Sequence, residues 1–78
     1  MPIPLYGFME GDTVGLLILA DEDETLQSLG WKLQEAARLR VAPRDPFRLI
    51  CDDRAMDLKL TVAQSGLQAL DRFDVVSA

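Results

Sequence analysis

The side chains of this 78-residue chain that could take part in chemistry are one cysteine and 13 carboxylates, and histidine is absent. A zinc or iron–sulfur site needs several Cys or His ligands, so the ligand count excludes both kinds of site. A nucleophilic enzyme needs a base beside its Ser, Thr or Cys, and the sequence places none there. We expect Cys51 to lie in or near the core as an unreactive thiol. An enzyme with a carboxylate-only site is the least favoured of the functions left open.

The densest group of carboxylates runs from Asp21 to Glu24 and is followed by Thr25. A calcium loop would need alternating oxygen ligands, a central glycine and a closing bidentate glutamate, and the run lacks this spacing. Thr25 is instead a good helix N-cap, and acidic residues there interact favourably with the helix dipole. We therefore interpret the run as the solvated start of a helix.

The elements that would position any site follow one another as strand, strand, helix, strand, short strand, helical turn and strand. The expected strands are residues 3–9, 13–20, 47–51, 56–58 and 72–77, and the expected helices are residues 26–39 and 61–66. Residues 10–12 are expected to form a tight hairpin connection. Pro4 donates no ladder hydrogen bond, so it must sit at an edge or a bulge. A hairpin, a crossing helix and returning strands pack as one sheet over one helix. The sequence therefore predicts an α+β fold, a β-grasp with a mixed sheet of four to five strands, as a single domain over residues 1–78. This order of elements resembles that of ubiquitin-like folds.

The expected helix has an apolar stripe that would face the sheet. Its members recur at three-four spacing and are Leu26, Leu29, Leu33, Ala36 and Ala37. Gly30 lies within this stripe, where it weakens the helix but would allow close approach to the sheet. Two prolines in residues 41–46 end the helix.

Composition excludes several classes of partner. The formal net charge is −5, so nucleic acid and anionic membranes would lack their main electrostatic attraction. The longest apolar run, Val14 to Ala20, is too short to span a bilayer. The start of the chain lacks the charged and apolar regions of a signal peptide. Together with a free thiol, this predicts a cytoplasmic protein that binds neither nucleic acid nor membrane.

The chemistry of other β-grasp proteins is not expected here. Modifiers and sulfur carriers need a flexible C-terminal Gly-Gly tail, whereas this chain stops at Ser77-Ala78 directly after the last expected strand. A β-grasp ferredoxin needs four cysteines to hold its cluster. Binding to another protein is the function that is left.

Trp31 is the first candidate for a partner-binding residue. It lies roughly 140° around the helix from Leu26, off the apolar stripe. Its expected neighbours on the helix surface are Gln27, Gln34 and Arg38. Trp and Arg are enriched at binding hot spots. The competing interpretation is that Trp31 folds over a sheet edge or a loop as an outlying part of the core.

The strand expected over residues 13–20 supplies a second candidate, because it is apolar on both sides. Leu17 and Leu19 alternate with a second apolar set, Val14, Leu16, Ile18 and Ala20. A sheet covered by one helix needs only one apolar face, so Leu17 and Leu19 predict that a partner covers the other. The alternative is that residues 52–61 fold across it.

Four of the eight basic residues fall within a short stretch that includes the expected helix end. They are Arg38, Arg40, Arg44 and Arg48. Cations suit helix C-termini, so a solvated helix end is one explanation. The other is an arginine patch that grips acidic residues on a partner.

The chain also resembles a known family. The resemblance rests on Ile3-Pro4-Leu5, on Val41-Ala42-Pro43-Arg44, and on the segment from Thr61 to Leu67 that leads to Asp74-Val75-Val76. These segments, in this order, are similar to the small γ subunit of bacterial toluene monooxygenase hydroxylases, the component B family. The similarity covers nearly the whole chain.

The resemblance implies a non-catalytic subunit of a soluble diiron monooxygenase that hydroxylates or epoxidises aromatic or alkene hydrocarbons with O₂. Its partners would be larger α and β hydroxylase subunits, and the largest would hold the diiron centre. No cofactor and no small-molecule substrate would bind to this chain, and the family supplies no catalytic or metal residue to transfer to it. The alternative function is a freestanding ubiquitin-like regulatory module that binds its target reversibly.

Overall fold

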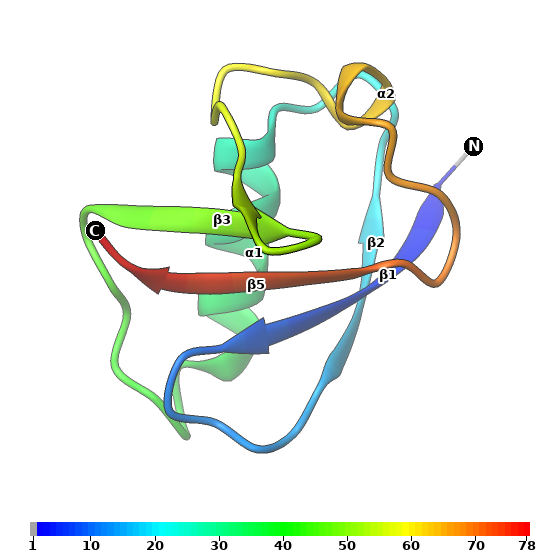
Figure 1. Ribbon diagram of the computed structural model, residues 1–78. Coiled ribbons are helices and arrows are strands. Elements are labelled where there is room, and N and C mark those ends of the chain that lie inside the picture. Colours follow the sequence, from blue (N-terminus) through cyan, green and yellow to red (C-terminus); the bar gives the residue numbers. More distant parts are fainter. Residues whose placement is uncertain (1) are drawn as a thin grey trace.

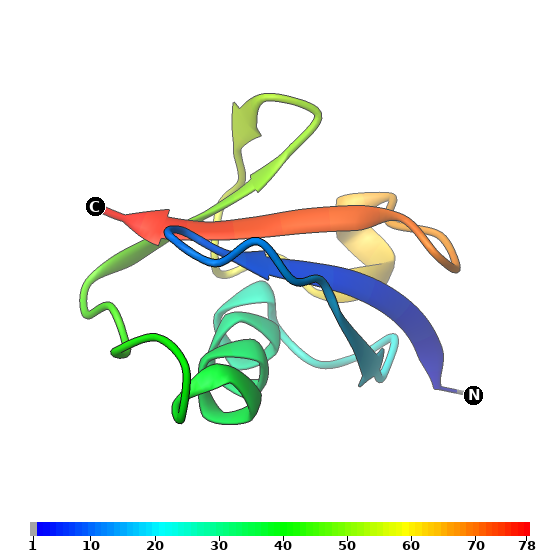
Figure 2. The same cartoon turned by 90° about the horizontal axis from the view of Figure 1, so that it is seen from below.

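One mixed sheet and one long helix form two layers in the computed structural model, which describes residues 2–78 (Figure 1). The elements are β1 Ile3–Met9, β2 Leu16–Ala20, α1 Leu26–Ala37, β3 Phe47–Cys51, β4 Arg54–Ala55, α2 Val62–Ser65 and β5 Arg72–Ser77. The strand order is β2-β1-β5-β3-β4, with β1 and β5 parallel and the other neighbours antiparallel. Helix α1 crosses one face of the sheet (Figure 2). The predicted α+β β-grasp fold is confirmed, and Met1 of the predicted domain lies outside the described residues.

The register between β1 and β2 assigns their side chains to the two faces of the sheet. Leu5 pairs with Ile18, and both side chains are buried on the inner face, toward α1. Tyr6 pairs with Leu17, and both side chains are exposed on the outer face. Directly opposed residues share a face and the faces alternate along a strand, so the register gives the sheet one buried side and one open side.

The core lies between α1 and the inner face. Its largest fully buried apolar side chains are Leu5, Leu26, Leu29, Leu33, Leu49, Val62, Phe73 and Val75. Gly30 allows the close approach predicted for it, because a β-carbon there would collide with Cε2 of Phe47. Ala36 was predicted to be buried, and this is wrong. The buried residues of α1 span an arc around the helix axis from Leu29 to Gln34. Ala36 lies about 20° outside this arc, on the side of Leu29.

Strand β2 begins at Leu16, three residues later than predicted, because the chain turns locally before it. The Asp12 backbone N–H donates to the Met9 carbonyl (3.0 Å), and the Val14 N–H donates to Oδ1 of Asp12 (3.2 Å). These bonds hold residues 10–15 as a loop instead of the predicted three-residue turn. Val14 is consequently exposed in the loop and does not point into the core.

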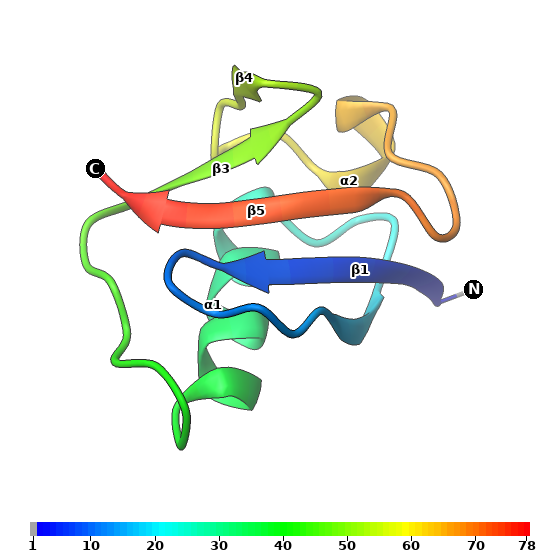
Figure 3. The ribbon, with the colours of Figure 1, turned by 60° about the horizontal axis from the view of Figure 1, so that its bottom comes forward.

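Strand β4 also differs from the prediction, lying at 54–55 instead of 56–58. Asp52 and Asp53 both adopt positive φ, 50° and 61°, which reverses the chain in two residues. Arg54 and Ala55 therefore pair at once with Cys51 and Ile50. Strands β3 and β5 have the predicted bounds, and β5 lies between β1 and β3 in the sheet (Figure 3).

Both predicted helix caps are present. The Thr25 and Thr61 hydroxyls accept hydrogen bonds from the backbone of Ser28 and Gln64, and Gly66 ends α2 at φ 83°. The segment between β4 and α2 is bonded to the start of α1 through Leu26 N–H and the Leu60 carbonyl (2.8 Å). The alternative that residues 52–61 cover Leu17 and Leu19 is therefore wrong.

Pro4 occupies a position in β1 where its missing N–H breaks no ladder bond. Its carbonyl accepts from the Leu70 N–H (2.6 Å), on the side of β1 that faces β5. Strand β5 pairs with β1 only from Tyr6 onward, so among residues 2–78 no strand acceptor lies opposite the Pro4 nitrogen. Pro4 thus sits where the β1–β5 ladder has not yet begun.

Candidate partner-binding surface

Three apolar side chains stand next to one another on the outer face, at the end of the sheet formed by β1 and β2. Leu17 and Leu19 are 56% and 57% exposed, and the half-exposed Tyr6 lies directly opposite Leu17. We call Tyr6, Leu17 and Leu19 the apolar strip. Leu70, which is also exposed, is tied to β1 beside the strip by its hydrogen bond to Pro4. Contiguous exposed apolar side chains are a feature of protein-binding surfaces, and tyrosine is enriched at binding hot spots.

The free edge of β2 beside the apolar strip is partly closed, so the strip offers a partner its side chains rather than its backbone. Leu17 and Leu19 turn their backbone groups away from β1, toward the free edge of β2. At this edge Nζ of Lys32 donates to the Leu19 carbonyl (3.0 Å) and pairs with Glu24 (2.8 Å). A charged lysine over an edge strand blocks the addition of another strand.

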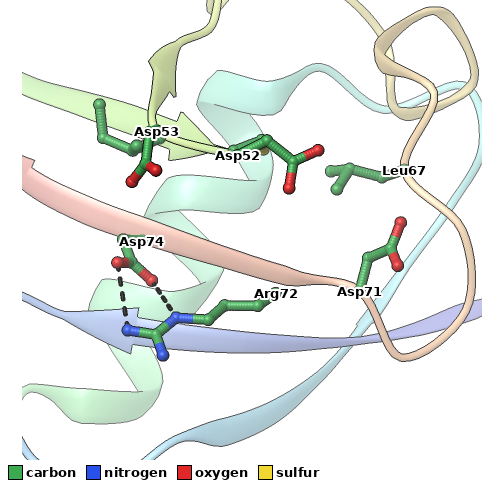
Figure 4. Close-up of a pocket in the computed structure, with 8 residues that line it drawn as sticks. Asp52, Asp53, Leu67, Asp71, Arg72 and Asp74 are labelled. Atoms are coloured by element: carbon green, nitrogen blue, oxygen red, sulfur yellow. Dashed lines mark hydrogen bonds and ion pairs between the residues drawn. The ribbon is translucent and has the colours of Figure 1, made fainter.

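Beside the strip the outer face is hollowed into a pocket of about 510 Å³, which we call the acidic pocket (Figure 4). It is lined by Ile50, Cys51, Asp52, Asp53, Leu67, Asp71, Arg72 and Asp74. Its single arginine is held by Asp74 (Nε to Oδ1, 2.8 Å) and lies 4.0 Å from the ring centre of Phe8. The pocket therefore carries a formal excess of three negative charges. Sequence reasoning missed it, because its walls come from two segments far apart along the chain.

Cys51 is buried, as predicted, and its environment makes it a poor nucleophile. Burial, with a smaller contribution from the nearby carboxylates of Asp52, Asp71 and Asp74, raises the pKa of the Cys51 thiol to about 11. At neutral pH the thiol is protonated.

We expect alkylation of Cys51 by iodoacetamide to reach half its maximal rate near pH 11 in the folded protein, against an ordinary pKa of 9.0. Between these values an unfolded chain loses its thiol proton while the folded chain keeps it, so the free energy of unfolding falls as pH rises through this window. Mass spectrometry of alkylation against pH measures the shift, with the urea-unfolded chain as control. Equal midpoints in the two states would contradict it.

Trp31 is divided between core and surface. Its ring packs edge-to-face on Phe47, with centroids 5.5 Å apart, and 37% of the residue stays exposed. Trp31 therefore covers part of the core, as the competing interpretation had it, and also keeps part of its surface exposed. Gln27, one turn earlier, is exposed. Both lie on α1, on the opposite side of the sheet from Leu17 and Leu19, so the structure does not bring these candidates together.

Gln34 was predicted on the exposed face of the helix, and this is wrong because it is only 1% exposed. Its Nε2 donates to the Arg44 carbonyl (3.0 Å), and its side-chain oxygen accepts from the Arg44 backbone N–H. Satisfying both ends of the amide lets a polar side chain be buried under the segment that follows α1. Gln34 is therefore a structural residue that holds this segment on the helix.

Three of the four candidate arginines are paired within the chain. Arg40 binds Asp12 through two hydrogen bonds (2.8 and 3.1 Å), and its bonds are the main reason that the pKa of Asp12 is lowered. Arg44 donates to the Glu10 carbonyl (3.1 Å), and Arg38 pairs with Glu35 (3.0 Å). Arg40 and Arg44 thus join the β1–β2 loop to residues 38–46. These contacts favour a structural role, and partner binding by the arginines stays a prediction.

Residues 2–78 were searched for metal-ligand clusters and for membrane-spanning helices. Nowhere in this part of the chain do three or more His, Cys, Asp or Glu side chains converge as metal ligands would. Within the same residues, every helix is too short or too polar to cross a membrane.

The sequence matches one family model, described as toluene-4-monooxygenase system protein B (TmoB), over residues 2–76. None of the curated proteins matches it.

The structure is similar to several solved structures. One is a chain of a toluene 4 monooxygenase HD complex with the inhibitor 4-bromobenzoate, with a TM-score of 0.91, 24% identity and full coverage of both chains. Another is the ubiquitin of Caldiarchaeum subterraneum, with a TM-score of 0.82, 18% identity and coverage of 100% of this chain and 95% of that one. A third is the UBL domain of Plasmodium falciparum Dsk2, with a TM-score of 0.81, 17% identity and full coverage of both. At these identities the likeness establishes the ubiquitin-like fold.

Proposed function

Because this chain belongs to the toluene-4-monooxygenase system protein B family, and so is a subunit of an aromatic monooxygenase, we propose that it is the non-catalytic γ subunit of a soluble diiron hydroxylase. Its partners are the larger α and β hydroxylase subunits, and the largest of these holds the diiron centre. The assembled complex hydroxylates or epoxidises aromatic or alkene hydrocarbons with O₂, in the cytoplasm. The family match over residues 2–76 carries this proposal.

The apolar strip supports a role in assembly. It exposes two leucines and a tyrosine next to one another, although the chain has a complete core without them. Burying exposed apolar surface stabilises an interface by roughly 25 cal/mol per Å², before the costs of association. We therefore assign the contact with a larger subunit to the outer face of the sheet.

The contribution of such a subunit to the complex is stabilisation. A partner that binds only the folded hydroxylase adds its binding free energy to the stability of that state. A two-layer domain with a packed core is well suited to this role, because few of its side chains and loops have to become ordered on binding. The chain thus buttresses the hydroxylase scaffold without touching substrate or metal.

A freestanding regulator is the second candidate function, and the likeness to ubiquitin and to a UBL domain favours it. The two functions differ in stoichiometry and in dissociation rate. A permanent subunit stays with its partners through high salt, whereas a reversible regulator dissociates during purification.

A tagged version of the chain, recovered from its native host, tests the proposal. We expect two larger chains in equal ratio to it, with about two iron atoms per large subunit, as a carboxylate-bridged diiron site requires. Washing at high ionic strength should leave this ratio unchanged. Recovery of the chain alone, or with an iron-free partner in lower ratio, would support the reversible regulator instead.

A further inference from the structure

We propose that the apolar strip and the acidic pocket form one docking surface for a single segment of a larger hydroxylase subunit, a segment that carries apolar side chains next to Lys or Arg. This inference rests on the proposed function, and it adds the chemistry of the partner segment. Aliphatic or aromatic side chains of the segment cover Tyr6, Leu17 and Leu19. Its cationic side chain enters the acidic pocket.

The strip and the pocket share a border, which is why one segment can reach both. At this border the Tyr6 N–H donates to the Asp71 carbonyl (2.9 Å), and the Leu70 N–H donates to the Pro4 carbonyl (2.6 Å). Tyr6 belongs to the apolar strip, and Asp71 lines the pocket. Their backbones are thus joined by a hydrogen bond, and no other element of the described chain separates them.

Carboxylates of the acidic pocket are available to a cationic partner. Asp74 is occupied by Arg72, and Oδ2 of Asp71 accepts from the Gln68 N–H (2.9 Å). Asp52 and Asp53 have no ion pair or side-chain hydrogen bond within residues 2–78. Their positive φ angles fix the turn that holds them at the pocket (Figure 4). Fixed carboxylates beside an apolar surface select a partner with complementary charge.

The negative charge of the chain disfavours a second copy of the same chain as the occupant of this surface. Each copy has a net charge of −5, so pairing two of these surfaces would bring two acidic pockets together. Like-charge contacts at an interface oppose association. Three of the chain's own arginines, Arg38, Arg40 and Arg44, are already paired with acidic or carbonyl groups of the same copy. A cationic segment of a different protein therefore fits the surface better.

The test measures the dissociation constant of the chain from the purified larger subunits, at low and at high ionic strength. The variant is Asp52→Asn with Asp53→Asn, because asparagine tolerates positive φ and preserves the turn. We expect binding to weaken about tenfold at low ionic strength, as for interfacial charge pairs, and the loss to shrink at high ionic strength. The matched control is Glu22→Gln with Asp23→Asn, which changes the net charge by the same amount outside the pocket and should stay within about twofold of the parent chain.

The outcomes separate this inference from the function on which it rests. Failure of the parent chain to bind the larger subunits would overturn the proposed function. If the parent binds, but the Asp52/Asp53 variant behaves like the Glu22/Asp23 control, the function stands and the acidic pocket is not part of the docking surface. An equal loss in both variants would show a general charge effect, and would also overturn the inference. Dimers of the free chain that compete with binding would point to a second copy as the occupant.

Discussion

The Gln34→Ala variant is expected to have a free energy of unfolding about 3 kcal/mol lower than that of the parent domain. Gln34 is almost fully buried, and it bonds both the N–H and the carbonyl of Arg44. Removing the amide leaves these two groups without partners under a partly buried segment, and each unsatisfied group costs about 1–3 kcal/mol. The missing side chain also leaves a cavity against α1. Urea unfolding of the free domain, followed by circular dichroism, measures the change.

Two control variants separate the hydrogen bonds from the volume. Gln34→Met keeps most of the buried volume and loses the amide, so it should retain the hydrogen-bond part of the loss, about 2 kcal/mol. Gln27→Ala, on the exposed side of the same helix, should change the free energy of unfolding by no more than about 0.5 kcal/mol. A Gln34→Met variant as stable as the parent domain would show that the amide contributes only its volume.

Much of the fold could be predicted because local signals determine it. The bounds of β1, β3 and β5 follow from alternation of apolar residues together with adjacent turn residues. The bounds of α2 follow from Thr61 and Gly66, whose caps need no distant partner. The starts of β2 and β4 could not be predicted in this way. They depend on a side-chain bond from Asp12 and on positive φ at Asp52 and Asp53, and the residue types permit both features without requiring them.

Only the part of the candidate surface that lies on a single strand could be predicted from the sequence. Leu17 and Leu19 were assigned to the outer face by alternation alone, and they lie there. Gln34 was misplaced because the segment that buries it is folded back by contacts ten residues later in the chain. The acidic pocket joins residues 50–53 to residues 67–74, and only the β3–β5 pairing brings them together. Sequence periodicity describes single elements, so it cannot show a surface that several elements share.

The double variant Leu17→Thr with Leu19→Thr is expected to weaken assembly with the larger hydroxylase subunits by about 100-fold, or about 2.7 kcal/mol. Both side chains are more than half exposed in the free domain, so they contribute little to its core and are available to a partner. Threonine keeps a high preference for strands, so β2 and its pairing with β1 should persist. Titration of the labelled chain with the purified larger subunits gives the dissociation constant, and urea unfolding gives the stability of the free variant.

The control for this variant is Leu39→Thr, which removes an apolar side chain that is 97% exposed just beyond the end of α1. If the outer sheet face is the contact, Leu39→Thr should leave the dissociation constant within about twofold of that of the parent chain. A double variant that binds as tightly as the Leu39 control would place the contact elsewhere, with the exposed edge of Trp31 on α1 as the next surface to test. A double variant that unfolds with the parent midpoint but fails to assemble separates loss of the interface from loss of the fold. Leu17 and Leu19 would then be interface residues that the domain does not need for its own stability.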